Sequence, residues 1–309
     1  MIEQTMPADK LRIAITGATG YLGSCLSHYF KEANACVFQL TSSPHNADTS
    51  LAVARFSLVD GVGNGFFAGN QIDMLIHAAY DFLPKSRKEI SDTNVKGSIA
   101  LFKQAREEGI KRIIFISTMS AYEGCRSLYG QAKLEIESAL RDLDLGLSLR
   151  PGLIYSTPLE ESGGMVGSIF RHVKHGGILP LIGGGNQILF LTHENDLARF
   201  IDGLISRHDE EWQRLRSERD YITTANPQPY TLRKIVELIA EAQGQKRIRL
   251  IPIPWRPVWV ALKFVETLGI NAGFRSDSVL SLAYQQRQLD LSSFPRDFSF
   301  RDFREALEA

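Results

Sequence analysis

The chain has 309 residues, of which 35 are basic and 35 acidic, and 44% of them are hydrophobic. This length accommodates one large α/β unit or a main domain with a smaller partner, and the balanced charge gives no field that would attract nucleic acid or an anionic membrane. The three cysteines lack metal-like spacing, and their odd number argues against a disulfide framework, so we expect a reducing cytoplasm as the location.

No stretch has the pattern of a signal peptide or of a membrane span. Residues 1–10 are polar and acidic without an apolar core, so we expect a flexible tail there. The most apolar later stretch, 255–269, is interrupted by Arg256, Lys263 and Glu266. This pattern is typical of an amphipathic helix rather than of a membrane segment.

The first predicted strand, Arg12–Thr16, leads into a glycine-rich turn and a predicted helix, Tyr21–Glu32. Three glycines in the turn have the spacing G-x-x-G-x-x-G. The first permits the sharp bend, the second lets the backbone approach a pyrophosphate, and the third lets the helix pack close to the strand. The free amides at the helix start would then face the phosphates. The sequence therefore predicts a dinucleotide-binding turn with the contact residues Gly17, Gly20, Tyr21, Leu22 and Gly23.

Apolar runs and helical periods continue to alternate as far as Tyr155. The carboxyl ends of parallel strands meet at one edge of a sheet, where ligands bind, so we expect the glycine turn, Ala78-Ala79 and Ser117-Thr118 to lie together. The alternation predicts the α/β class, with a Rossmann-type doubly wound parallel sheet over residues 11–155. The further predicted strands are Cys36–Leu40, Met74–Ala78, Ile113–Ser117 and Gly146–Arg150, and the further predicted helices are Thr93–Glu108 and Tyr129–Leu143.

Residues 156–309 have a different character, with clustered glycines and prolines and shorter strand and helix signals. Helices are predicted over 197–206 and 232–243, and the charged run 207–220 is expected to be a solvated helix or loop. We expect this part to form mainly a smaller C-terminal α+β lobe that binds the substrate, with some segments returning to the main sheet.

Tyr129 and Lys133 are four residues apart, so on a helix their side chains share one face. A tyrosine hydroxyl has a pKa near 10, too high for a base at neutral pH. A neighbouring ammonium group and a positively charged nicotinamide ring would lower that pKa. The tyrosine could then remove a hydroxyl proton from a substrate as hydride leaves the same carbon.

Four sequence features together resemble the short-chain dehydrogenase/reductases, and in particular their extended branch of NAD-dependent nucleotide-sugar epimerases and dehydratases. They are the T-G-x-x-G-x-x-G turn, the F-I-S-T strand end, the Y-x-x-x-K pair and the segment L-R-P-G-L-I-Y at 149–155. The resemblance is dense from Leu11 to Tyr155, persists weakly through 180–201, and is not specific after Asp220.

The resemblance implies roles for several residues. Tyr129 would be the acid/base, and Lys133 would bind the nicotinamide ribose and lower the pKa of the tyrosine. Thr118 would hydrogen-bond the reacting oxygen of the substrate, with Ser117 as the competing choice. Cofactor contacts are implied for Ala78, Ala79, Asn94 and Gly152, of which Asn94 would tie the active-site backbone together and could also cap a helix. Arg275 lies where related enzymes often have an arginine for the substrate diphosphate, although a surface salt bridge is an equal interpretation.

Two departures from the family pattern affect the expected chemistry. The segment between Thr118 and Tyr129 is shorter than in most extended members, which abbreviates one wall of the substrate pocket. Sugar 4,6-dehydratases have an acidic pair directly after the threonine, and this chain has Met119 and Ser120 there. Neither side chain can shuttle a proton at neutral pH, so dehydration is disfavoured, whereas epimerisation or simple carbonyl–alcohol redox chemistry is not.

The choice between NAD and NADP is open in the sequence. An acidic residue that would bind the adenosine ribose is expected at the end of the second strand, but the chain has Thr41, Ser42 and Ser43 there, and no arginine follows for a 2′-phosphate. The hydroxyl groups of Ser42 and Ser43 could accept either ribose, and Thr41 and Ser42 are the candidate cofactor contacts. We expect NAD because of the epimerase resemblance, with NADP as the alternative.

The leading hypothesis is an NAD(P)-dependent enzyme acting on a nucleotide sugar, most plausibly by 4-epimerisation. The alternatives are an NADP(H)-dependent reductase of a small carbonyl substrate and a non-catalytic cofactor-binding subunit. No metal site is expected. The helices 93–108 and 129–143 have apolar faces that, by the family resemblance, would form a homodimer interface.

Overall fold

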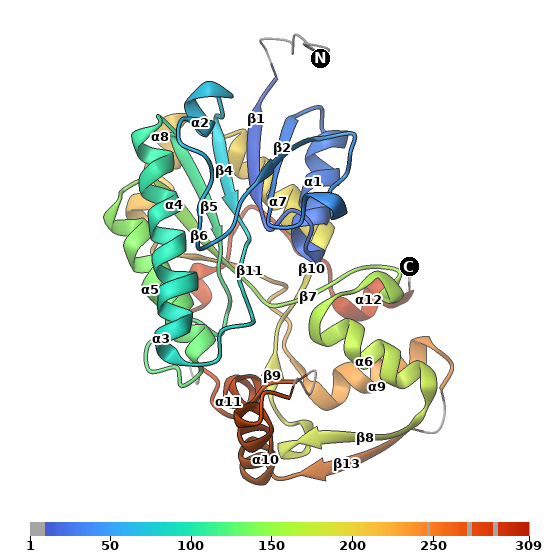
Figure 1. The fold of residues 1–309 in the computed structure, drawn as a ribbon. Helices are drawn as coiled ribbons and strands as arrows, with labels where there is room; N and C mark the ends of the chain where they lie inside the picture. Colours follow the sequence, from blue (N-terminus) through green and yellow to red (C-terminus); the bar gives the residue numbers. More distant parts are fainter. Residues whose placement is uncertain (1–9, 246–247, 271–273, 287–289, 309) are drawn as a thin grey trace.

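A seven-stranded parallel sheet forms the centre of the fold (Figure 1), with the strand order β11-β6-β5-β4-β1-β2-β3. The computed structural model describes residues 10–245, 248–270, 274–286 and 290–308, so the expected tail 1–10 lies outside the described residues except for Lys10. The sheet strands are β1 Arg12–Thr16, β2 Cys36–Thr41, β3 Ala52–Arg55, β4 Met74–His77, β5 Arg112–Ile116, β6 Gly146–Pro151 and β11 Ile222–Thr224. This is the predicted doubly wound α/β fold.

Helices cover both faces of the sheet, because the buried strands are apolar on both sides. One face packs against α1 Tyr21–Glu32, α7 Glu194–Ile205 and α8 Asp209–Glu218. The other face packs against α2 Phe66–Gly69, α4 Lys96–Glu107 and α5 Leu128–Asp142. The short helix α3 Arg87–Ile90 and a π-helical turn, Ser91–Val95, lead into α4.

β1 pairs with β2 on one side and with β4 on the other. The chain therefore adds β2 and β3 on one side of β1 and then continues with β4 on the opposite side. The turn after β1 therefore opens at the point where successive crossovers run to opposite sides of the sheet. Open α/β sheets bind ligands at such a point, beyond the carboxyl ends of the strands. The glycine-rich turn lies there.

The C-terminal lobe is assembled around two smaller clusters of apolar side chains and lies in the lower part of Figure 1. The chain returns from it to the main sheet, since β11 pairs with β6. The lobe's helices are α6 Gly164–His175, α9 Leu232–Ala242, α10 Trp255–Thr267, α11 Ser276–Ala283 and α12 Phe303–Glu308. Its paired strands are β7 Leu153–Tyr155 with β10 Leu191–His193, β9 Ile188–Leu189 with β12 Tyr230–Thr231, and β8 Gly177–Ile182 with β13 Ile248–Ile253.

The predicted elements agree with the structure to within a few residues. The helix predicted over Thr93–Glu108 starts later, at Lys96, because its first residues form the π-helical turn. The strand β3 was not predicted, since it is only four residues long and its residues alternate between partly buried and exposed, with small alanines at two positions. No helix among the described residues is long and apolar enough to cross a membrane.

Candidate active site

A cleft of about 410 Å³ lies beyond the carboxyl ends of the central strands. It is lined by residues from the glycine turn, from the segments that follow β4 and β5, from the start of α5 and from the end of β6. Twelve of the predicted site residues meet in its wall: Gly17, Gly20, Tyr21, Leu22, Gly23, Ala78, Ala79, Ser117, Thr118, Tyr129, Lys133 and Gly152. Thr41, Ser42, Asn94 and Arg275 lie outside this wall.

The glycine turn allows backbone segments to approach more closely than a side chain would permit. Gly17 has a φ of 68°, and a Cβ atom on it would lie 2.9 Å from the Cα atom of Ala79. A Cβ atom on Gly23 would lie 2.1 Å from the carbonyl oxygen of Gly17. Contacts this short do not occur between real atoms, so the first glycine is required by the bend and the third by the packing of α1 on β1.

The start of α1 is open for an anion. Gly20 is its N-cap residue and makes no side-chain cap, and no residue in the described part of the chain caps the helix from elsewhere with a side chain. The first amides of a helix lack intrahelical partners, and the helix dipole attracts negative charge to them. A cleft lined by backbone, with uncapped amides at one end, fits the pyrophosphate of a dinucleotide.

Tyr21 and Gly152 connect the cofactor side of the cleft to the lobe. The hydroxyl group of Tyr21 is hydrogen-bonded to that of Ser156 at 2.6 Å. The N–H group of Gly152 donates to Thr192 at 2.9 Å, and a Cβ atom on Gly152 would lie 2.2 Å from the carbonyl oxygen of Phe190. The smallest residue is therefore needed where the loop before β10 passes β6.

Thr41 and Ser42 lie at the end of β2 and differ in exposure. The hydroxyl group of the buried Thr41 is hydrogen-bonded to that of Thr19 at 2.8 Å, whereas Ser42 is exposed. The register of the sheet pairs Thr41 with Arg55, the exposed last residue of β3. Arg55, which belongs to a strand that the sequence analysis did not predict, thus lies beside the end of β2 in the sheet.

Tyr129 and Thr118 meet in the cleft. The hydroxyl group of Thr118 lies near that of Tyr129, and its oxygen accepts the N–H group of Ser120 at 3.1 Å. Burial raises the pKa of Tyr129 to about 12, although the nearby Thr118 hydroxyl group acts in the opposite direction. The two groups can contact the same atom of a ligand.

Ser117 points its hydroxyl group elsewhere. It donates a hydrogen bond to Glu137, which is itself buried in a two-point ion pair with Arg150, with N–O distances of 2.9 and 2.6 Å. The guanidinium group of Arg150 lies 3.4 Å from the centroid of the Tyr221 ring. This geometry favours Thr118 over Ser117 as the partner of a substrate oxygen.

Lys133 is 2% exposed, and its ammonium group donates to the carbonyl oxygen of Ile116 at 2.7 Å. Burial lowers the pKa of Lys133 to about 7, and the negative charge of Glu137 opposes this change. The role of Lys133 in lowering the pKa of Tyr129 stays a prediction. The nitrogen lies 5.8 Å from the centroid of the tyrosine ring, and burial dominates the pKa of the phenol.

The segment after β4 is fixed by buried polar groups. The N–H groups of Ala78 and Ala79 both donate to the hydroxyl group of Thr16, at 3.2 Å each. The side chain of the buried Asn94 accepts from the N–H group of Asp81 at 2.7 Å and donates to the carbonyl of the same residue at 3.0 Å. Asn94 therefore anchors backbone next to the cleft and does not line it.

Arg275 also contacts this segment rather than the open part of the cleft. Its guanidinium group donates to the carbonyl oxygens of Phe82 at 3.0 Å and Pro84 at 2.9 Å. The ring of Phe82 lies nearly parallel to that of Tyr129, with centroids 5.8 Å apart, and the ring of Tyr80 meets Tyr129 edge-on at 4.8 Å. Three aromatic rings thus form one wall of the cleft.

The sequence did not reveal Arg55, this aromatic wall or the cap that Asp277 places on α5. Each depends on a tertiary contact between segments far apart in the chain. Asp277 accepts hydrogen bonds from the N–H groups of Leu128 and Tyr129. The one available signal was local: apolar residues at 80, 82 and 83 directly follow the predicted strand end.

Comparisons with known proteins agree with this geometry. Residues 13–215 match the model of the NAD dependent epimerase/dehydratase family. The chain is 27% identical over 145 residues to GDP-mannose 3,5-epimerase 1 of Oryza sativa subsp. indica, which covers 44% of this chain and 38% of that protein. It is 28% identical over 163 residues to UDP-glucose 4-epimerase of Lacticaseibacillus casei, which covers 45% and 49% of the two chains. The matches thus span less than half the length of these two relatives.

The fold is also similar to solved structures. The UDP-glucose 4-epimerase of Thermus thermophilus, in complex with NAD, superimposes with a TM-score of 0.64 at 18% identity, over 88% of this chain and 97% of that one. At this level of identity the likeness supports the fold alone. The family match confirms the resemblance drawn from the glycine turn and the tyrosine–lysine pair.

Proposed function

The chain belongs to the NAD dependent epimerase/dehydratase family, an enzyme family of the extended short-chain dehydrogenase/reductase type, and from this premise we propose that it epimerises a nucleotide sugar at carbon 4. Its family relatives include a UDP-glucose 4-epimerase and a GDP-mannose 3,5-epimerase. Members of the family depend on NAD. The dinucleotide would be held by the glycine turn, by the uncapped start of α1 and by the backbone of Ala78 and Ala79.

The chemistry rests on Tyr129 and Thr118. Bound NAD supplies reversible acceptance of a hydride from one carbon of the sugar. Tyr129 takes the proton from the hydroxyl group on that carbon and later returns it, and Thr118 donates a hydrogen bond to the same oxygen. Lys133 binds ribose hydroxyl groups of the dinucleotide. The residues after Thr118 are Met119 and Ser120, which cannot serve the acid–base role that elimination of water requires.

One observation carries the proposal: the neighbouring hydroxyl groups of Tyr129 and Thr118 lie in the same cleft as the glycine turn. A proton donor and acceptor are therefore available next to the place where a dinucleotide fits. A helix-surface tyrosine would instead have been exposed and distant from the turn.

A second candidate activity is favoured by the aromatic wall. Phe82 and Tyr80 pack against Tyr129, and the guanidinium group expected to bind a substrate diphosphate is occupied by backbone carbonyls. Among the described residues that line the cleft, Lys133 is the only cation. An apolar wall of this kind suits the reduction of a small or apolar carbonyl substrate by a nicotinamide cofactor. This alternative uses the same tyrosine and differs in the net consumption of cofactor.

We also propose a homodimer and a cytoplasmic location. Paired α4 and α5 helices would form the dimer interface, as the family resemblance suggests. The large apolar side chains on these two helices are at least partly buried in the described monomer, so the interface would be built mainly from their polar edges. The location is supported by the cysteines, none of which forms a disulfide within the described part of the chain.

The decisive experiment supplies UDP- and GDP-sugars to the purified protein without added cofactor and measures the isomer ratio over time. We predict conversion between 4-epimers. Tyr129→Phe should lower the rate by at least about a hundredfold and leave the affinity for NAD unchanged, because the cofactor cradle is intact.

Tyr29→Phe is the matched control, since that phenol lies on α1 and its hydroxyl group contacts Asp202. Its rate should equal that of the wild type. Wild-type turnover by Tyr129→Phe would refute the assignment, and stoichiometric loss of NADPH with a free carbonyl compound would favour the reductase.

A further inference from the structure

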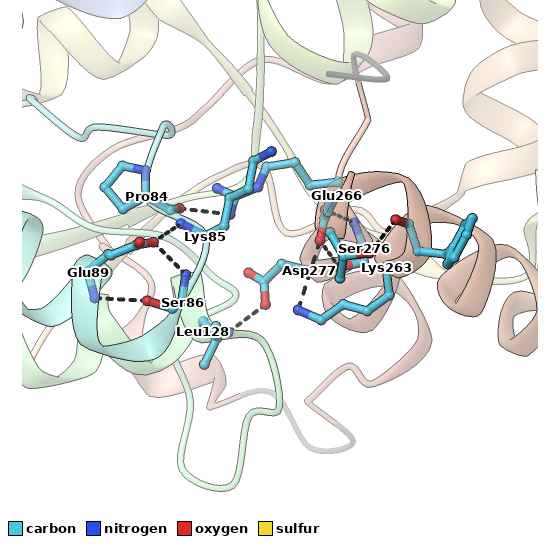
Figure 2. A network of polar contacts seen from close by, with 12 residues as sticks. Pro84, Lys85, Ser86, Glu89, Leu128, Lys263, Glu266, Ser276 and Asp277 are labelled. Carbon is cyan, nitrogen blue, oxygen red and sulfur yellow. Dashed lines mark hydrogen bonds and ion pairs between the residues drawn. The ribbon is translucent and has the colours of Figure 1, made fainter. Parts of the chain in front are cut away.

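A carboxylate from the C-terminal lobe caps the helix that carries Tyr129. Asp277, the second residue of α11, accepts hydrogen bonds from the backbone N–H groups of Leu128 at 2.7 Å and of Tyr129 at 3.0 Å. Figure 2 shows the contact between the Asp277 carboxylate and Leu128. The partners are 149 and 148 positions apart in the chain, and the negative charge lies at the positive end of the α5 dipole.

The cap is additional to the one that α5 already has. Ser127, its local N-cap residue, accepts the N–H group of Gly130 on its side chain at 3.1 Å and that of Gln131 on its carbonyl at 3.0 Å. A local cap of this kind leaves the first two amides of a helix to water. Asp277 therefore adds a fixed point at the helix start, where Tyr129 is the second residue.

Asp277 is itself held in place from α10. The neighbouring Ser276 donates to Glu266 twice, from its N–H group at 2.8 Å and from its hydroxyl group at 2.7 Å. Lys263 lies 3.9 Å from the same carboxylate. Figure 2 shows these residues converging on the start of α11. The Asp277 carboxylate that contacts the backbone of Tyr129 thus belongs to a segment that hydrogen bonds to α10 hold in place.

Arg275, which precedes Ser276 in the chain, links the same segment of the lobe to the wall of the cleft. Arg275 holds the carbonyl oxygens of Phe82 and Pro84, and the ring of Phe82 packs against that of Tyr129. One three-residue segment of the lobe therefore fixes the backbone of Tyr129 directly and supports its ring through Phe82.

We propose that Asp277 is a positioning residue for Tyr129: by holding the backbone N–H group of Tyr129 from the C-terminal lobe, it sets the place of the phenol relative to Thr118. The catalytic helix is then correctly placed only when the lobe is docked. This inference rests on the proposed acid/base role of Tyr129. Small displacements of a reacting group have large kinetic effects, since an error of about 1 Å can cost about a hundredfold in rate.

The test compares Asp277→Ala and Asp277→Asn with the wild type in the nucleotide-sugar assay. Alanine removes both acceptors, so kcat should fall by about tenfold to a hundredfold. KM should change by less than about threefold, because Asp277 does not line the cleft. Asparagine keeps one acceptor oxygen and should recover part of the lost kcat.

Glu108→Ala provides the matched control. Glu108 also caps a helix start from a distant segment, since it accepts the N–H groups of Gly65 at 2.8 Å and of Phe67 at 2.7 Å. It lies away from the cleft. If the Glu108 variant loses as much melting temperature as Asp277→Ala but keeps its kcat, the loss of kcat in Asp277→Ala is due to lost positioning of Tyr129 and not to lower stability. Equal loss of kcat in both variants, or no loss in Asp277→Ala, would overturn the proposal.

A second readout does not depend on turnover. Hydrogen exchange of the amides of Leu128 and Tyr129 should be faster in Asp277→Ala than in the wild type, with Gln131 unaffected by comparison. Equal exchange rates would refute the positioning contact. A wild-type protein that converts no nucleotide sugar would contradict the proposed function, and the exchange measurement would still decide whether Asp277 holds the helix start.

Discussion

Lys133 is a buried residue, and its burial disfavours the charged form of its amino group. Its pKa in the folded protein is about 7, against 10.5 for an ordinary lysine. Between these two pH values the unfolded chain binds more protons than the folded one, so the contribution of Lys133 to the free energy of unfolding increases as the pH rises through this window. At neutral pH and below, the residue costs stability that its role at the site requires.

We therefore predict that Lys133→Met stabilises the protein while it removes turnover. The melting temperature should rise by roughly 2 °C or more at a pH below 7, and the gain should shrink as the pH approaches the pKa of an ordinary lysine. Thermal denaturation of both proteins across this range checks the prediction. A variant that is less stable than the wild type at every pH would contradict it.

Arg55 lies beside the end of β2, where the adenosine ribose of the cofactor is expected. An exposed guanidinium group can bind a 2′-phosphate, and residues 42–47, which follow β2, include no carboxylate that would repel one. We predict that Arg55→Gln lowers the affinity for NADP by about tenfold, the value of one charge-assisted contact, and leaves that for NAD unchanged.

Equilibrium binding of both cofactors to the two proteins provides the measurement. Arg87→Gln is a suitable control, because Arg87 is an exposed arginine at the start of α3. If Arg55→Gln weakens the binding of NAD and of NADP equally, the arginine supports the fold of the sheet edge at β3 and does not distinguish the two cofactors.

At the scale of the elements, the turn between β1 and α1 has to stay free of side chains. Gly20 has an ordinary extended backbone, so substitution strains no dihedral angle, but a Cβ atom there would already lie 3.2 Å from the carbonyl oxygen of Gly17. We predict that Gly20→Val abolishes measurable NAD binding and leaves the fold intact. Gly203→Val, in a part of α7 with open space around the glycine, is the control.

Isothermal titration with NAD, together with circular dichroism, tests this prediction. Retained affinity in Gly20→Val would mean that the cofactor does not approach the turn. Loss of affinity in both variants would point to a general effect of valine in these helices.

The elements that could be predicted from the sequence share a local signal. Arg12–Thr16 and Cys36–Thr41 are buried along almost their whole length and appear as apolar runs, and the glycine spacing marks the turn between them. By contrast, β3 alternates between partly buried and exposed residues in a strand of four. The position of Arg55 next to Thr41 could not be predicted either, because it follows from the register of the folded sheet and not from the local sequence.

The candidate site divides in the same way. Tyr129 and Lys133 share a face of α5 because of their spacing, which the sequence contains. The choice between Ser117 and Thr118 depends on which hydroxyl group meets the buried Glu137, and that contact requires the folded helix. The sequence singles out Arg275 only by its position. Its contact with the carbonyls of Phe82 and Pro84 depends on tertiary packing.

At the scale of the whole molecule, the two parts of the chain are joined through the cleft and through α5, the helix that carries Tyr129. The lobe contributes Asp277 to the start of α5 and Arg275 to the wall formed by the segment after β4. The chain also returns to the main sheet as β11, next to β6. The cleft is therefore shaped from both sides, and the short segment between Thr118 and Tyr129 leaves its remaining wall to aromatic rings.

The central claim is that a hydride leaves one carbon of a nucleotide sugar and returns to the same carbon, with Tyr129 moving only the hydroxyl proton. The most direct test runs the isomerisation of UDP- and GDP-sugars in deuterated water and analyses the products by mass spectrometry and NMR. We predict interconversion of the 4-epimers without deuterium at any carbon. Deuterium bound to a sugar carbon in the product would contradict the account, because it would mean that a proton, and not a hydride, had been removed from that carbon.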